Sequence, residues 1–399
     1  MPRTAPFGGV RWQRAAAWIA SLAIVFCSPL IGDLRLALLQ AFPRHYVAII
    51  STAVMAGGVL LLGLCLRVIT TERPRRIGLL GLAAVLAAWS FAALRSGNAN
   101  VDAVEAFHFV EYGVLTVLFF PVWQPGARWE AYVEATLATT VVGVADEWFQ
   151  WFVPGRAGEW HDVLFDLLAT ASGLLLCLAL DVRGRFPSGG GSLDPPQRRG
   201  RRLGLGAAVV ILLLGAFIAT IHLGSEIHDP GIGTFRSRFS ADRLRELGDE
   251  RTRRWAGGSP PVVGRYGRED QYQAEALWHV RRRNFGMDPD RRGDPIELDI
   301  AWRENQILDA YFASVMSAPP APGTTGHRLA PEQLAAVDAA RARGTAPFVS
   351  DAEAMPIYVW PPMVWWIGVA SVAAAALVAG VMLDRARVAR EHTNVEDGL

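Results

Sequence analysis

The sequence EAFHFVEYGVL, residues 105–115, opens a region in which apolar helical segments carry ionisable side chains. The region ends at Gly173 and includes VVGVADEWFQ, residues 141–150, where two acids follow an apolar run. An ionisable group at the centre of a membrane helix costs roughly 2.5–3.5 kcal/mol on insertion scales. Because the chain keeps several such groups in one region, we expect Glu105–Gly173 to hold its functional site.

The composition indicates membrane spans with an added polar part. Hydrophobic residues make up 51% of the 399 residues, which is high for a soluble protein. The 39 basic residues, all arginine, nearly balance 38 acidic residues, and a net charge of +1 implies no bulk attraction to nucleic acid. The three cysteines lie in apolar runs without a disulfide or metal-binding pattern. No cofactor is indicated.

Eight apolar segments are candidates to cross a membrane as helices. A bilayer core needs about 20 apolar residues in a helix, and a helix satisfies its own backbone polar groups. The segments are 15–31, 47–69, 77–94, 105–122, 131–152, 162–180, 203–222 and 358–383. The first is short and contains Pro29, and we expect a retained helix there and not a cleaved signal peptide. The predicted fold class is an all-α polytopic membrane helix bundle.

Arginine residues gather in alternate connections between these segments. They are frequent before residue 15 and in 67–76, 183–202 and 385–390. By the positive-inside rule, both termini are cytoplasmic and residues 223–356 are extracytoplasmic. The predicted organisation is an N-terminal span with its outer loop at 1–46, a membrane core at 47–180, a flexible Arg/Pro/Gly linker at 181–202, a seventh span at 203–222, the extracytoplasmic domain at 223–356 and a C-terminal span with its tail at 357–399.

The extracytoplasmic domain is predicted to be mostly helical. It has no long alternating strand pattern, and stretches such as DPGIGTF, residues 229–235, indicate loops. Ser240 is a plausible N-cap for the helix that follows it. The pairs Glu275–His279 and Glu304–Asn305 are interpreted as solvated helix faces. No protein partner can be assigned to this domain.

The candidate ligand-binding residues converge near the outer leaflet in this topology. They are His108, Tyr112, Asp146, Glu147, Gln150, Arg156, Asp162 and Asp166. His108 and Tyr112 are four residues apart, so they share a helical face. Asp146 and Glu147 point about 100° apart, so we expect only one of them to face the same cavity as Gln150.

Three interpretations of this set remain open. The polar groups can fasten three helices together, bind a small molecule or lipid headgroup, or catalyse a reaction. No nucleophile with an adjacent base is visible, so no catalytic residue is assigned. No HxxxH or HxH spacing supports a metal, and none is predicted.

Four ordered elements resemble the VanZ-like family of bacterial membrane proteins. They are HFVEYGVL at 108–115, DEWFQ at 146–150, VPGR at 153–156 and DVLFDLLATASG at 162–173, within a similarity that spans Val47–Leu180. The chain departs from the family pattern at Glu105, where relatives often have Lys, at Asp166 in place of Asn, and at Ala169 in place of Gly. Ala169 and Gly173 still form a small-xxx-small surface for close helix packing.

The resemblance implies a protein of the bacterial cytoplasmic membrane. The family's namesake is associated with low-level teicoplanin resistance, without a settled biochemical activity. We therefore expect a non-catalytic binding or accessory protein that contacts membrane lipids and acts on a lipid-linked envelope component or an amphiphilic glycopeptide. The alternatives are an enzyme on a lipid-linked precursor, with Glu147 or Asp162 as general base, and a structural anchor for a partner protein.

Overall fold

The protein consists of two compact units in a computed structural model. The structure describes residues 8–95, 99–120, 129–153, 156, 158–180, 198–254, 267–288, 294–318, 326–340, 347–353 and 355–396. The first unit comprises Met1–Gln150, Gly158–Phe217 and Trp366–Leu399. The second unit comprises Trp151–Ala157 and Ile218–Trp365.

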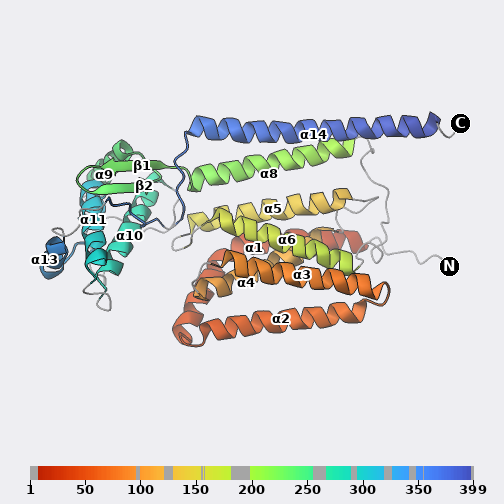
Figure 1. Cartoon of the computed structure of the whole chain (residues 1–399), viewed down its shortest axis with the longest axis horizontal. Helices are drawn as coiled ribbons and strands as arrows, with labels where there is room; N and C mark the ends of the chain where they lie inside the picture. Colours follow the sequence, from red (N-terminus) through yellow and green to blue (C-terminus); the bar gives the residue numbers. More distant parts are fainter. Residues whose placement is uncertain are drawn as a thin grey trace. The chain divides into compact units, whose positions relative to one another are not determined.

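Long helices that run side by side build the first unit (Figure 1). They are α1 (Gly8–Ala41), α2 (Tyr46–Val68), α3 (Arg73–Leu94), α4 (Ala99–Phe119), α5 (Trp129–Phe152), α6 (Trp160–Leu180), α8 (Arg199–Ile221) and α14 (Pro362–Glu396). Each coincides with one of the eight predicted segments, which confirms the all-α fold class. The predicted linker ends earlier than expected, because Arg199–Arg202 already belong to α8. The last span begins at Pro362, since Pro favours the first position of a helix.

Five helices within the described residues are long and apolar enough to cross a membrane: α2, α3, α6, α8 and the part of α14 from Pro362 to Ala389. Helix α1 would be a sixth if its halves, bent by 56° between Cys27 and Leu30, form one span. A bend there fits Pro29, which removes a backbone donor. Helices α4 and α5 do not meet the same criterion, and they carry five of the predicted site residues, His108, Tyr112, Asp146, Glu147 and Gln150. The chain is thus a multi-pass helical membrane protein.

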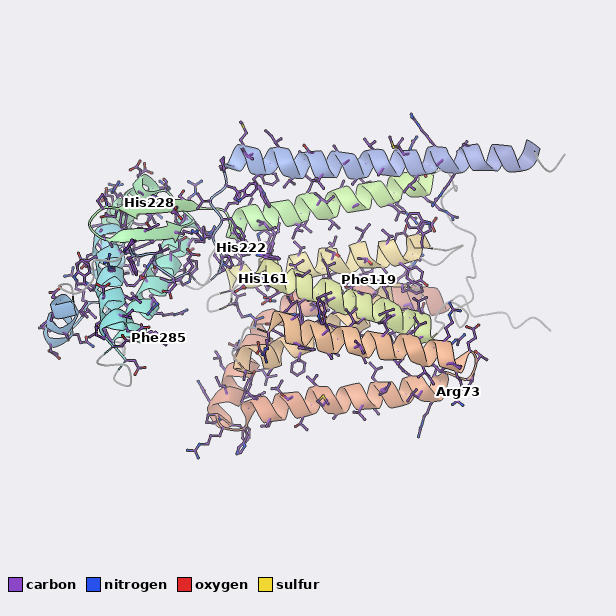
Figure 2. The ribbon with its side chains drawn as sticks, viewed as in Figure 1. Arg73, Phe119, His161, His222, His228 and Phe285 are labelled. Atoms are coloured by element: carbon purple, nitrogen blue, oxygen red, sulfur yellow. The ribbon has the colours of Figure 1, made fainter. Side chains whose placement is uncertain are left out.

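Helices α4 and α6 pack closely through glycine. A Cβ atom at Gly173 would lie 2.8 Å from the carbonyl oxygen of Gly113 and 2.9 Å from Cβ of Thr116. Ala169 is fully buried, and its carbonyl oxygen faces Gly113. The predicted small-residue surface is therefore the contact surface of these two helices. Phe119 of α4, which is labelled in Figure 2, packs edge-on against Trp18 of α1 with ring centroids 6.4 Å apart.

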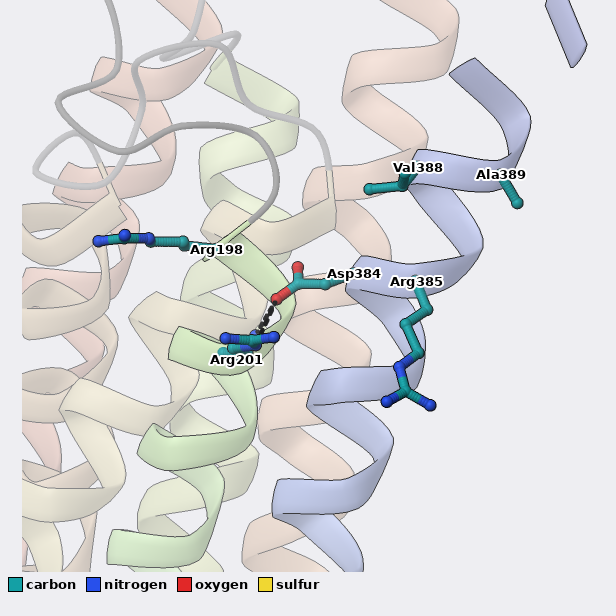
Figure 3. A pocket seen from close by; sticks show the side chains of 6 residues that line it. All are labelled: Arg198, Arg201, Asp384, Arg385, Val388 and Ala389. Atoms are coloured by element: carbon teal, nitrogen blue, oxygen red, sulfur yellow. Dashed lines mark hydrogen bonds and ion pairs between the residues drawn. The ribbon is translucent and has the colours of Figure 1, made fainter. Parts of the chain in front are cut away.

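Charged side chains join α5, α8 and α14 at one end of the first unit. Glu134 of α5 pairs with Arg202 of α8, and Glu130 of α5 pairs with Arg387 of α14. The start of α5, the start of α8 and the C-terminal part of α14 therefore lie at the same end of the unit. This agrees with the prediction that all three are on the same side of the membrane. Beside them is a cavity of about 450 Å³, lined by Arg198, Arg201, Asp384, Arg385, Val388 and Ala389 (Figure 3).

Asp384 caps a helix other than its own. Its carboxylate accepts hydrogen bonds from the backbone N–H groups of Gly200 (2.6 Å) and Arg201 (3.0 Å) at the start of α8. Those donors have no partner inside α8 because they belong to its first turn. The negative charge also favours the positive end of the helix dipole.

We expect Asp384→Ala to lower the free energy of unfolding of the first unit by about 0.5–2 kcal/mol, since two backbone donors lose their acceptor. Thermal unfolding of the full chain in detergent measures this loss. Glu72→Ala is the control, because Glu72 is 57% exposed in its pair with Arg75. Equal unfolding temperatures for the two variants would contradict the capping role.

The second unit combines a short hairpin with helices. Strands β1 (Ser225–Asp229) and β2 (Gly233–Ser237) pair antiparallel, with Ile227 opposite Phe235. The helices are α9 (Ala241–Arg254), α10 (Arg268–Gly286), α11 (Pro295–Tyr311), α12 (Ala313–Met316) and α13 (Pro331–Ala340). The prediction that DPGIGTF is only a loop is wrong, because its last three residues open β2. Ser240 caps α9 as predicted, and its hydroxyl accepts from the N–H of Arg243.

Polar side chains are buried in the core of the second unit. His279 Nδ1 lies 2.6 Å from one carboxylate oxygen of Glu304, and the Ser350 hydroxyl donates to the other oxygen at 2.5 Å. Glu275 accepts from the Ser237 hydroxyl at 2.6 Å. Burial raises the pKa of the Glu275 carboxyl, which nearby Arg238 partly opposes. The interpretation of these pairs as solvated faces is wrong: Glu275 is 2%, His279 4% and Glu304 0% exposed.

Candidate ligand-binding site

Helix α4 contributes an imidazole and a phenol to the predicted site. The rings of His108 and Tyr112 stack with centroids 6.2 Å apart, as their four-residue spacing on one face allows. Tyr112 is fully buried, and its hydroxyl donates to Oδ2 of Asp146 on α5 at 3.3 Å. The His108 side chain is 11% exposed. This face of α4 is therefore directed at the acidic end of α5.

Helix α5 contributes two carboxylates that converge on one amide. Nε2 of Gln150 donates to Oδ2 of Asp146 at 3.1 Å and to Oε1 of Glu147 at 2.9 Å. The expectation that only one of the two acids faces Gln150 is wrong, because rotation about the side-chain bonds offsets the angle between adjacent residues. The backbone N–H of Glu159, just before α6, donates to Oε2 of Glu147 at 3.1 Å. Both acids are buried, at 2% and 0% exposure.

Helix α6 contributes a buried carboxylate, Asp166, which is 2% exposed. Neither of its carboxylate oxygens has a hydrogen-bond partner among the described residues. Its Oδ2 lies 2.7 Å from where a Cβ atom at Gly143 of α5 would be. Gly143 therefore leaves the space that this carboxylate occupies. Asp162, one turn earlier on α6, is half-buried and interacts electrostatically with Asp166 and Glu147.

The structure brings together most of the residues predicted from the sequence. The contacts between α4 and α5 involve His108, Tyr112, Asp146, Glu147 and Gln150, and α6 adds the carboxyl groups of Asp162 and Asp166. Arg156 belongs to the segment Trp151–Ala157 of the second unit, and its place in the site stays a prediction. Sequence reasoning missed Gly143 and the backbone of Glu159, because neither residue type signals a role by itself.

The arrangement has the chemistry of a buried acidic site. Three side chains, His108, Asp146 and Glu147, each offer a nitrogen or oxygen atom within 4.8 Å of the others. Carboxylates accept hydrogen bonds from hydroxyl, amide and ammonium groups, and the Gln150 amide can also accept. The site therefore suits a ligand rich in donors or a cation.

The fold is that of a polytopic helical membrane protein, with a buried polar cluster formed by α4, α5 and α6. Residues 58–181 match the family model described as VanZ/LLP1, so this part of the 399-residue chain is a VanZ/LLP1 domain. The match confirms the resemblance expected from the four ordered elements, and it includes all of α4, α5 and α6. No curated protein and no solved structure matches the chain.

Proposed function

We propose that this protein is a non-catalytic binding or accessory protein of the bacterial cytoplasmic membrane. Its ligand is a lipid-linked envelope component or an amphiphilic glycopeptide, bound near the outer leaflet by the cluster between α4, α5 and α6. The observation that carries the proposal is the contact of Tyr112 and Gln150 with Asp146 inside the VanZ/LLP1 domain. Ionisable side chains within membrane helices cost insertion free energy. They almost always face the interior of the helix bundle, where they commonly belong to functional sites.

The chemistry of the cluster favours ligands that donate hydrogen bonds. Sugar hydroxyls and amines match the carboxylates of Asp146, Glu147 and Asp166, whereas an unaccompanied phosphate would meet like charge. Glu105, where relatives often have Lys, strengthens this preference. In the proposed orientation both termini are cytoplasmic. This is supported by Arg202 of α8 and Arg387 of α14, which both pair with acids near the start of α5 and so lie at the same end of the helix bundle.

Single substitutions at the cluster test the proposal on the purified full chain in lipid nanodiscs. We expect His108→Ala and Gln150→Ala each to weaken teicoplanin binding about two- to tenfold, the size of one lost hydrogen bond. Titration calorimetry measures the dissociation constant. The controls are His45→Ala and Gln40→Ala, the same residue types at exposed positions of the α1–α2 region.

A second probe separates the two sources of ligand. Vesicles that contain a lipid-linked cell-wall precursor replace teicoplanin in the same titration. Arg156→Ala is measured with both probes, since its role is inferred from the sequence alone. If the His108 and Gln150 variants bind both probes as the controls do, the cluster fastens helices and the proposed function is wrong.

A further inference from the structure

Three side chains of the cluster have the composition and spacing of a metal site. The ligand atoms of His108, Asp146 and Glu147 lie within 4.8 Å of one another. Nitrogen and oxygen ligands bind Zn²⁺ at about 2.0–2.2 Å, so atoms that share one ion lie at most about 4 Å apart. Small side-chain rotations therefore bring all three atoms onto one ion. The residues come from two helices, α4 and α5, so packing of those helices assembles the set.

Neighbouring groups orient the two carboxylates. The Gln150 amide donates to one oxygen of each acid, and the Tyr112 hydroxyl donates to Oδ2 of Asp146. The N–H of Glu159 donates to Glu147. Hydrogen bonds of this kind fix ligating carboxylates in metal sites and typically change metal affinity 10–100-fold.

Asp166 is a second and independent observation. Its carboxylate is 2% exposed, and neither oxygen has a hydrogen-bond partner in the described part of the chain. It faces Gly143, which precedes Asp146 and Glu147 by three and four residues and so shares their side of α5. A buried carboxylate without a partner is expected to be protonated or to sit near a cation. Asp166 is thus aimed at the side of α5 that carries the other two acids.

We propose that His108, Asp146 and Glu147 bind one divalent transition-metal ion, with Asp166 beside it as a further carboxylate. One imidazole with several carboxylates suits Zn²⁺ or Mn²⁺ better than Mg²⁺ or Ca²⁺, which prefer oxygen alone. The ion would neutralise acids that otherwise repel one another. This inference goes beyond the proposed function, because the ion can bind without any organic ligand.

Metal titration of the full chain tests the inference. The protein in nanodiscs is stripped with a chelator, and Zn²⁺ alone is titrated by calorimetry, with metal content measured by mass spectrometry. We expect saturation near one ion per chain, and at least about tenfold weaker binding in His108→Ala and Glu147→Gln. Glu130→Gln is the matched control, because Glu130 lies on the same helix about 25 Å away. Its affinity should equal that of the wild type.

Two results would overturn the inference: no saturable Zn²⁺ binding by the wild type, or wild-type affinity in both variants. If the variants do not fold, pulsed electron paramagnetic resonance of Mn²⁺ bound to the wild type decides. A single imidazole nitrogen beside the ion supports the site, and its absence contradicts it. No organic ligand is present in these assays. Their failure therefore leaves the proposed function standing, and intact metal binding without teicoplanin or precursor binding rejects only that function.

Discussion

Glu304→Ala is expected to destabilise the second unit by about 3–5 kcal/mol, because two buried partners would each lose a hydrogen-bond acceptor at a cost of about 1–3 kcal/mol. Glu304 is fully buried and accepts from the Ser350 hydroxyl at 2.5 Å, while His279 Nδ1 lies 2.6 Å from its other oxygen. Alanine would leave both partners inside the core without an acceptor. An unsatisfied buried donor loses its hydration without compensation.

Hydrogen exchange of α10 and α11 in the full chain measures this effect. Their amides should exchange faster in Glu304→Ala by a factor of about 100 or more, since each 1.4 kcal/mol is tenfold in an equilibrium constant. Glu304→Gln keeps one acceptor oxygen, so its amide exchange rates should lie between those of the wild type and those of Glu304→Ala. Glu246→Ala is the control, because Glu246 is 62% exposed in its pair with Arg243. Slow exchange in Glu304→Ala, as in this control, would show that the buried pair contributes little.

His279 and its helix neighbour Glu275 show where the prediction from sequence fails in this chain. Spacing of four places Glu275 and His279 on one face of a helix, but it does not say what that face meets. In the structure α11 and β2 cover it, so a charged pair that is usually solvated becomes part of the core. Strands β1 and β2 are not predicted from the sequence because SEIHD and GTFRS each contain a single large apolar residue, and one such residue shows no alternation.

The membrane helices were more predictable, because long apolar runs identify them without knowledge of their neighbours. The family elements then indicated which polar residues converge. Two features of the site are visible only in the three-dimensional structure. The side-chain rotations of Asp146 and Glu147 bring both acids to Gln150, and Gly143 makes room for Asp166. Both features depend on contacts between helices, and these contacts cannot be predicted from the hydrophobic periodicity of a single helix.

Gly173→Val should disrupt the contact on which the candidate site depends. Even a Cβ atom at this position would lie 2.8 Å from the Gly113 carbonyl oxygen, which is backbone and cannot rotate away. Helix α4 must therefore move from α6. Overpacking typically costs about 1–3 kcal/mol, and more where backbone must shift. The movement would also separate Tyr112, one residue before Gly113, from Asp146.

Thermal unfolding and Zn²⁺ titration of the same sample separate stability from site geometry. We expect Gly173→Val to lower the unfolding temperature and weaken Zn²⁺ binding at least about tenfold, with Gly173→Ala between it and the wild type. Gly58→Val on α2 is the matched control, because a Cβ atom there meets nothing within 4 Å. It changes the helix propensity by the same amount. Equal unfolding temperatures for the two valine variants would mean that α4 and α6 tolerate separation, and that the close glycine contact does not hold the site together.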